Sequence, residues 1–232
     1  MNNVHQYPGK ELVLFEEAVA WKKYLAKKIQ PFIHGTVLEV GAGLGTSTRI
    51  LNDGSASSWQ LLEPDQKMYA GLIEKKSSFP VNTSIYNGVI TDVGQHVDTI
   101  LYIDVLEHIE ADAAELSLAA SHLNEKGHLI VLSPAFNFLY SEFDKAIGHF
   151  RRYSKKELKK MAPASTKLVS LQYLDSLGYF ASVANKIFLH QTYPSRRQLV
   201  FWDKYLIPVS EITDRLFLHS FGKSILSVWE KQ

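Results

Sequence analysis

The stretch Thr36-Val-Leu-Glu-Val-Gly-Ala-Gly-Leu-Gly-Thr46 decides the fold of this chain. Its first part, Thr36–Val40, is β-branched or apolar apart from one acid, and this pattern predicts a buried parallel strand. Three glycines at alternate positions follow. Glycine lets the backbone turn tightly and approach a ligand closely, because it has no Cβ. Residues 46–51 can then open a helix. A strand, a glycine turn and a helix N-terminus together form the nucleotide-binding corner of a doubly wound sheet.

The length, net charge and composition of the chain exclude several classes of protein. A length of 232 residues is enough for one α/β domain with insertions. A formal net charge of +1 argues against nucleic-acid binding, which needs clustered basic charge. The absence of cysteine excludes disulfides, zinc–thiolate sites and cysteine nucleophiles. We find no apolar run of the roughly 18–20 residues that a membrane span needs and no apolar core of a signal peptide near the N-terminus. The composition and the lack of such apolar runs predict a soluble cytoplasmic protein.

Two more acids follow predicted strands. Trp59–Leu62 reads as a second strand that ends at Glu63, and an acid there can accept hydrogen bonds from both ribose hydroxyls of an adenosine cofactor. Thr99–Ile103 is an apolar central strand that ends at Asp104. NAD sites use the same acid after the second strand, so Glu63 predicts adenosine binding without choosing the cofactor.

The spacing of the glycines separates two cofactor classes. The dinucleotide fingerprint G-x-G-x-x-G would need a glycine where Thr46 stands. The observed pattern is Glu39-x-Gly41-x-Gly43-x-Gly45, and the run Asp104-Val-Leu-Glu-His-Ile109 follows the central strand. In order and spacing, these elements resemble the class I S-adenosylmethionine (SAM) methyltransferases. The resemblance implies S-adenosyl-L-methionine as cofactor, with its methionine end beside the glycines and its methyl group facing Asp104.

The third predicted strand, Pro80–Tyr86, ends in Asn87-Gly88-Val89. Related enzymes often place an acid here beside the adenine, so recognition of the adenine is expected from backbone groups or from Thr91 and Asp92. His108 can contact the cofactor or the substrate. By resemblance, the cofactor-binding residues are Glu39, Gly41, Gly43, Gly45, Thr46, Glu63, Pro64, Gly88, Val89, Asp104 and Val105.

A long aromatic and charged loop, Ala135–Tyr153, follows the fifth predicted strand, His128–Ser133. Loops at the carboxyl edge of an α/β sheet carry function. His149 is the predicted general base, because imidazole titrates near neutral pH. The alternative is that His149 only ties down the loop. A capping box beginning at Ser154 predicts that a helix follows the loop.

Charged and aromatic side chains accompany His149. Asp144 can orient His149 or pair with an arginine. Arg151 and Arg152 suit a substrate carboxylate or phosphate, and internal ion pairs are the alternative. In the N-terminal segment, aromatic residues either wall a substrate cleft or pack on the sheet. The predicted substrate-binding residues are Tyr7, Trp21, Tyr140, Asp144, Arg151, Arg152 and Tyr153.

The loop sharpens the resemblance. The run Gly148-His-Phe-Arg-Arg-Tyr-Ser154 is similar to a bacterial subgroup of SAM methyltransferases, many of which sit beside glycosyltransferases or in natural-product pathways. The resemblance implies a Rossmann-like, doubly wound, seven-stranded sheet with an antiparallel last strand. It also implies transfer of a methyl group to a small molecule such as a sugar or a secondary metabolite.

The expected single domain, 1–232, has three parts. Residues 1–35 form an N-terminal helical segment, 36–133 the cofactor-binding half, and 134–232 the substrate-side loop, a helical insertion and the last strands. We expect helices at Leu177–Gln191 and Gln198–Leu218, interrupted by Pro194 and Pro208. The insertion is rich in aromatic residues, so it can roof the active site, close a homodimer or simply extend the core.

Two other functions stay open. One is an NAD-dependent oxidoreductase, against which Thr46 and the Asp104–Ile109 run count. The other is a non-catalytic binding protein on a methyltransferase fold, against which the retained acids and glycines count. No metal site is predicted, because the nine histidines are scattered without ligand spacing.

Overall fold

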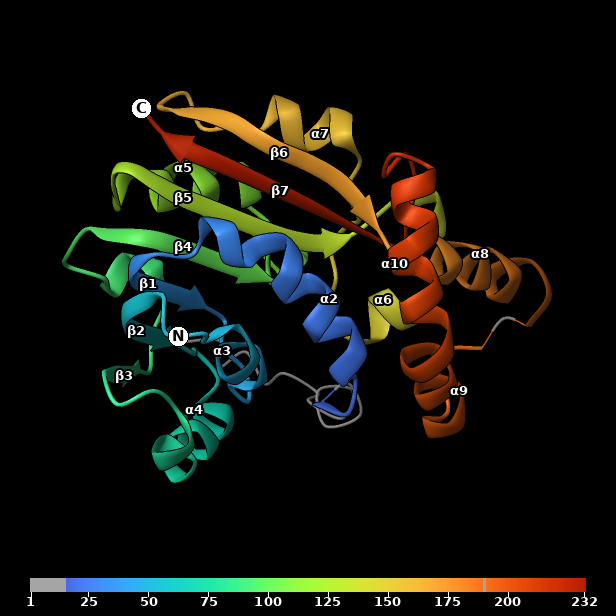
Figure 1. Cartoon of the computed structure of the whole chain (residues 1–232), viewed down its shortest axis with the longest axis horizontal. Helices are drawn as coiled ribbons and strands as arrows, with labels where there is room; N and C mark the ends of the chain where they lie inside the picture. The colour runs from blue at the N-terminus through green and yellow to red at the C-terminus, as the bar shows by residue number, and fades with distance from the viewer. Residues whose placement is uncertain (1–15, 190) are drawn as a thin grey trace.

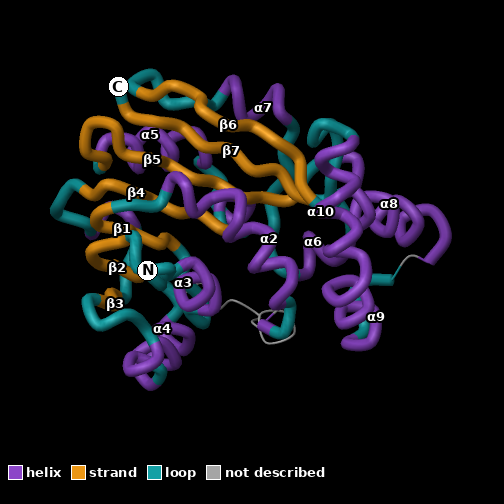
Figure 2. The backbone as a smooth tube through the Cα atoms, viewed as in Figure 1, coloured by secondary structure: helices purple, strands orange, loops and turns teal. Residues whose placement is uncertain are grey.

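The computed structural model describes residues 16–189 and 191–232 of the chain. Seven strands form one sheet with helices on both faces (Figures 1 and 2). The strand order is β3-β2-β1-β4-β5-β7-β6, and only β7 runs antiparallel to its neighbours. This confirms the predicted fold class. The strands are β1 Gly35–Val40, β2 Ala56–Leu62, β3 Thr83–Tyr86, β4 Val97–Ile103, β5 Leu123–Pro134, β6 Thr166–Leu174 and β7 Ser224–Lys231.

The central strands are apolar because both of their faces are covered. In β1, Val37 belongs to one buried cluster, whereas Leu38 and Val40 belong to another on the opposite face. Successive side chains of a strand point to opposite faces, so a strand between two layers of helices needs apolar residues at every position.

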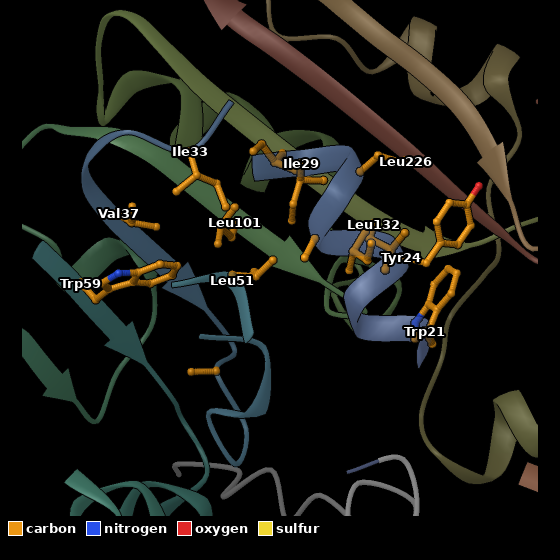
Figure 3. Close-up of a cluster of buried hydrophobic side chains, with 14 of the residues drawn as sticks. Trp21, Tyr24, Ile29, Ile33, Val37, Leu51, Trp59, Leu101, Leu132 and Leu226 are labelled. Carbon is orange, nitrogen blue, oxygen red and sulfur yellow. The ribbon is translucent and has the colours of Figure 1, made fainter. Parts of the chain in front are cut away.

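Helices α2 (Val19–Ile29) and α3 (Thr46–Leu51) cover one face of the sheet, and α5 (Asp112–Ser121) and α7 (Lys155–Lys160) cover the other (Figure 1). On the α2 face, Ile29 and Tyr24 lie among side chains from β1, β4, β5 and β7 (Figure 3). Burial of these apolar side chains removes them from water, at roughly 25 cal/mol per Å² of apolar surface.

The remaining helices are α4 (Gln66–Glu74), α6 (Glu142–Ala146), α8 (Ser176–Ala184), α9 (Arg196–Phe201) and α10 (Ile207–Leu216). Leu72 of α4 belongs to the buried cluster on the α2 face, whereas α8, α9 and α10 lie beyond the carboxyl ends of the parallel strands (Figure 1). Short 3-10 helices cover Gln30–Phe32, Lys76–Ser78, Ile90–Asp92, Leu106–His108 and Asn137–Leu139, and π-helical turns cover Asn185–Leu189 and Trp202–Leu206. Among the described residues, no helix is both long and apolar enough to cross a membrane.

The helical insertion between β6 and β7 lies beyond the carboxyl ends of the parallel strands (Figure 1). Asp203 of the insertion accepts hydrogen bonds from the backbone N–H groups of Ala20 and Trp21, at 3.0 and 2.8 Å. These are first-turn donors of α2, which have no partners within the helix. The buried Asp214 accepts from the Tyr24 hydroxyl at 2.8 Å and from the backbone of Asp175 at 2.7 Å. The insertion is therefore tied both to the N-terminal helix and to the end of β6.

Some boundaries differ from those expected. The fifth strand was expected to begin at His128, but β5 begins at Leu123, so Gly127 lies inside it. A Cβ on Gly127 would lie 2.8 Å from the carbonyl oxygen of Asn124 and 2.9 Å from that of Asp98, so this glycine permits close strand packing. Pro208 does not break the helical run, since α9, the π-helical turn Trp202–Leu206 and α10 follow one another directly and Pro208 stands at the second position of α10.

Candidate active site

The glycine turn lies at the carboxyl end of β1, where the strand order reverses between β1 and β4. Ligands of open α/β sheets bind in the crevice at such a switch point. Gly41, Gly43 and Gly45 have φ angles of 67°, 56° and 68°, which lie in the left-handed region. These values confirm the predicted tight turn, and Gly45 caps the N-terminus of α3.

Two of these glycines also permit close packing. A Cβ on Gly41 would lie 2.7 Å from a methyl group of Val105, next to Asp104. A Cβ on Gly45 would overlap the ring of Phe79 and would lie 2.9 Å from Leu72 of α4. The turn is thus held between the residues that follow β4 and those around α4.

We expect Gly45→Ala to lower the free energy of unfolding by at least about 2 kcal/mol, because alanine disfavours a left-handed φ by roughly 1–2 kcal/mol and its methyl group overlaps Phe79. Gly71→Ala is the matched control. Gly71 is helical and nothing lies within 4 Å of the position that a Cβ would take there, so alanine should raise stability by about 0.5–1 kcal/mol. Urea denaturation of both variants measures the difference, and equal stabilities would contradict the packing argument.

Glu63 connects the end of β2 to the glycine turn. Its carboxylate accepts hydrogen bonds from the backbone of Gly43 at 2.7 Å and of Asp65 at 2.9 Å. Asp65 in turn accepts from the backbone of Lys67 and Met68 and caps α4. The Glu63 carboxyl is buried, and burial raises its pKa. It is therefore held in one position at the edge where an adenosine ribose is expected.

The end of β3 is bound to the end of β2. The Asn87 side chain donates to the carbonyl oxygens of Glu63, at 2.8 Å, and of Pro64, at 3.2 Å. The Asp92 carboxylate accepts from the backbone of Val89 at 2.9 Å and leaves no room for a Cβ on Gly88. Four residues predicted to bind the cofactor thus lie near the turn or at the same edge of the sheet. They are Thr46, at the start of α3, and Pro64, Gly88 and Val89.

Acidic groups with raised pKa values gather at this edge. Burial raises the pKa of Glu39 to about 7, although the Thr48 hydroxyl donates a hydrogen bond to it. Asp104 has solvent access and a left-handed φ of 54°, yet desolvation by the surrounding protein raises its pKa to about 6 against the opposing fields of His149, Lys223 and Lys22. Among the described residues, the groups that lower the pKa of Glu39 and Glu63 are hydrogen-bond donors and not cations. Such an edge favours a positively charged ligand.

In the loop after β5, Asp144 joins both of its predicted partners. Its carboxylate accepts from His149 Nδ1 at 2.9 Å and from Arg152 Nε and Nη2, each at 2.8 Å. Asp144 is fully buried, and the hydrogen bonds from His149 and Arg152, which outweigh the opposing effect of burial, hold its pKa well below its usual range. The network fixes the orientation of the His149 ring.

The other predicted substrate residues of the loop also have internal partners. Arg151 donates to Asp112 Oδ2 at 2.8 Å, and the buried Tyr153 hydroxyl donates to the same oxygen at 2.9 Å. Tyr140 donates to the His149 carbonyl oxygen at 2.6 Å. Of the two alternatives for the arginines, the structure shows internal ion pairs. The expected capping box is present, since Ser154 and Glu157 exchange hydrogen bonds at the start of α7.

A family model of the methyltransferase domain matches residues 14–172. The chain belongs to the methyltransferase domain family. No curated protein sequence gives a significant match. Membership and fold support SAM-dependent methylation and leave the alternative of an NAD-dependent oxidoreductase without support.

Solved structures share the fold of this methyltransferase at low sequence identity. A complex of the Haloferax volcanii Trm112 activator with a methyltransferase gives 16% identity and a TM-score of 0.66, covering 97% of this chain and 94% of the other. A protein of Bacillus halodurans described as a methyltransferase has 15% sequence identity and a TM-score of 0.60, and the match covers 90% of this chain and 98% of the other. Coclaurine N-methyltransferase, bound to N-methylheliamine and S-adenosylhomocysteine (SAH), has 14% sequence identity and a TM-score of 0.61. The match covers 92% of this chain and 72% of the other. These similarities establish the fold alone.

The N-terminal aromatic residues of the methyltransferase were predicted either to wall a cleft or to pack. Trp21 is buried, with its ring 6.2 Å from that of Tyr24 and 6.0 Å from that of Trp202. This contact joins α2 to the insertion and agrees with packing. Tyr7 lies outside the described residues.

The sequence indicated His108 as a contact of cofactor or substrate, but the group that it forms with Glu107 and His149 was not predicted. Glu107 and His108 of the Leu106–His108 turn lie beside His149, with the two imidazole centroids 4.6 Å apart. Glu107 is fully buried, and among the described residues neither of its carboxylate oxygens has a hydrogen-bond partner. The signal was the position of both residues in the Asp104–Ile109 run, at the edge that the His149 loop was expected to cover.

The stability of the ligand-free methyltransferase should fall as pH rises from 5 to 8. The folded-state pKa of Glu39 is about 7 against a usual 4.5, so its contribution is complete below pH 4.5 and is lost as pH rises through 7. We expect Glu39→Gln to reduce the difference between the unfolding free energies at pH 5 and pH 8 by on the order of 2–3 kcal/mol. Denaturant titrations at both pH values measure it, with the exposed Glu125→Gln as control. Equal pH dependence of Glu39→Gln and the parent protein would contradict the assignment.

Proposed function

We propose that this protein transfers a methyl group from SAM to a small-molecule acceptor, a sugar or a secondary metabolite, in the cytoplasm. The observation that carries the proposal is the set of carboxylates at the switch point of the sheet, of which Glu63 is bonded to the glycine turn itself. The near-neutral charge of the chain and the Gly148–Ser154 run, similar to the bacterial small-molecule subgroup, support the acceptor class.

The residues of this edge fit SAM. Glu63 would accept hydrogen bonds from the ribose hydroxyls, and the backbone of Gly41 and Gly43 would adjoin the methionine part. Glu39 and Asp104, whose pKa values are raised by desolvation, would offset the positive charges of the sulfonium and the ammonium group. When bound, SAM supplies a methyl group that is activated by its positively charged sulfur. The remaining contacts along the same edge are assigned to Thr46, Pro64, Gly88, Val89 and Val105.

The loop after β5 would hold and activate the acceptor. Because His149 Nδ1 is bonded to Asp144, its Nε2 is the atom left to act on an acceptor hydroxyl or ammonium group. We assign acceptor activation to His149. Arg152 is bonded through Nε and Nη2 to Asp144 and is buried, so its part in acceptor binding is to hold Asp144 and, through it, His149. Asp144, Arg151 and Tyr153 hold the loop in place, and Tyr140 lies beside His149.

Calorimetric titration with SAM, SAH and NAD tests the cofactor, and transfer of labelled methyl groups to a panel of sugars, phenols and amines tests the acceptor. The proposal expects micromolar binding of SAM and SAH, no binding of NAD, and transfer to at least one small molecule. Binding of NAD alone would overturn it. Labelling of protein or nucleic acid in place of small molecules would overturn the acceptor class.

We also propose that the chain forms a homodimer through the insertion. Several large apolar side chains are exposed there, among them Phe188 at 76% and Leu218 at 83% of their surface. Exposed apolar patches of this kind are typical of interaction sites. Sedimentation equilibrium measures the association, and a monomer at all concentrations would contradict it.

A further inference from the structure

Three side chains with metal-binding atoms meet where the turn after β4 contacts the loop after β5. They are Glu107 and His108, from the turn after β4, and His149, from the loop after β5. One oxygen of the carboxylate and one nitrogen of each imidazole all lie within 4.8 Å of one another. Neither histidine is exposed beyond an intermediate degree, while the neighbouring Gly148 and Phe150 are exposed and leave the cluster near the surface.

The Glu107 carboxyl is only weakly bonded by the described part of the chain. It is fully buried, and neither oxygen forms a hydrogen bond of standard geometry within the described part of the chain. Ser133 lies close enough to oppose the rise of the Glu107 pKa, but burial raises this pKa well above its usual range. His149 Nε2 lies 3.8 Å from Glu107 Oε1, which is too far for a hydrogen bond. A buried carboxyl that is only weakly bonded is costly, so a ligand that binds it would relieve that cost.

Both imidazoles are held from the outside by hydrogen bonds, as metal-binding histidines are. His149 Nδ1 donates to Asp144, which Arg152 holds in turn, and this leaves the Nε2 lone pair on the side of Glu107. The backbone of Gly148 bonds the ring of His108 and opposes the fall of its pKa, so the imidazole is the donor in that bond. An imidazole that donates from one ring nitrogen keeps a lone pair on the other, which is the form that binds a metal.

We propose that Glu107, His108 and His149 bind one divalent transition-metal ion, such as manganese, cobalt or zinc. Two imidazoles and one carboxylate suit these ions better than magnesium or calcium, which prefer oxygen ligands. Bonds of about 2.0–2.2 Å would hold the ligand atoms about 3–3.5 Å apart, so the side chains must close by roughly 1 Å around the ion.

Three protein ligands leave coordination positions open for water or for an acceptor hydroxyl, whose pKa the ion would lower. This role rests on the proposed methyltransferase function, whereas binding of the ion does not. With the ion bound, His149 activates the acceptor as a ligand and not as a free base.

Binding is tested on the full chain, depleted of metal with a chelator and free of SAM. Calorimetry with Co²⁺ and Zn²⁺ should show one ion per chain, and bound Co²⁺ should give a visible absorption band. Glu107→Gln, His108→Gln and His149→Gln should each lower affinity by about 100-fold or more, since loss of an outer partner alone lowers it about 10–100-fold. Saturating metal should raise the melting temperature of the parent protein by about 5 °C or more, but not that of Glu107→Gln.

Two histidine variants serve as controls. His96→Gln removes an exposed histidine, and His128→Gln removes one partner of another close pair, His34 Nε2–His128 Nδ1 at 3.2 Å. Both should keep the affinity of the parent protein. Loss of binding in His128→Gln but not in His149→Gln would overturn the assignment, and so would the absence of binding by the parent protein. Calorimetry with SAM on the same metal-free sample separates the proposals. A protein that binds SAM but neither Co²⁺ nor Zn²⁺ overturns only the metal site, and a protein that binds the metal but not SAM overturns only the cofactor.

Discussion

Glu63→Ala is expected to lower the affinity for SAM and for SAH by roughly 10²–10⁴-fold. A carboxylate that accepts from both ribose hydroxyls forms two charge-assisted hydrogen bonds, each contributing about 1.5–3 kcal/mol. The backbone of Gly43 and of Asp65 already holds the Glu63 carboxylate at the edge, so little order has to be imposed on binding. Calorimetry with both ligands measures the loss.

Glu63→Gln and Asp65→Ala are the matched controls. The glutamine keeps an oxygen acceptor without the charge and should lose less affinity than alanine. Asp65→Ala removes the cap of α4 in the same turn, which costs about 1 kcal/mol of stability and should leave affinity for SAM nearly unchanged. A Glu63→Ala affinity within a few-fold of the parent value would contradict the ribose assignment.

Asp144→Ala is expected to lower the free energy of unfolding by about 3–5 kcal/mol, because it leaves the Arg152 guanidinium buried without its carboxylate. Arg152 is only 8% exposed, so water cannot replace the lost partner. A change of this size lowers the melting temperature of a chain of this length by roughly 6–20 °C. The same change frees the His149 ring, so turnover should fall as well.

The neighbouring arginine provides the comparison. The side chain of Arg151 is 33% exposed in its pair with Asp112, so Arg151→Ala should cost at most about 1 kcal/mol. In the double variant Asp144→Ala/Arg152→Leu, much of the loss should be recovered, because no buried charge remains. If Asp144→Ala lowered the free energy of unfolding by less than Arg151→Ala does, the buried-network argument would be contradicted. Thermal and denaturant unfolding of all three variants measure these differences.

Local patterns in the sequence determined the cofactor edge. The run before Gly41 is β-branched and largely apolar, which is typical of a buried strand, and glycines at alternate positions supply the three left-handed φ angles. Asp65 and Ser154 cap helices through hydrogen bonds to residues two or three positions away. Such interactions depend on neighbours in the chain, and for that reason the sequence alone was sufficient to predict them.

Long-range packing decided the rest. Which carboxylates would pair with Arg151 and Arg152 depended on how the loop folds against Asp112 and α6, so the sequence left both alternatives open. His108 and His149 are far apart in the chain and have no ligand spacing, yet β4 and β5 end side by side and bring them together. The weakly bonded carboxyl of Glu107 exists only because neighbouring elements bury it. The sequence therefore determined the sheet and its cofactor edge through local geometry, while the charge partners and the histidine cluster arose from contacts that only the tertiary fold creates.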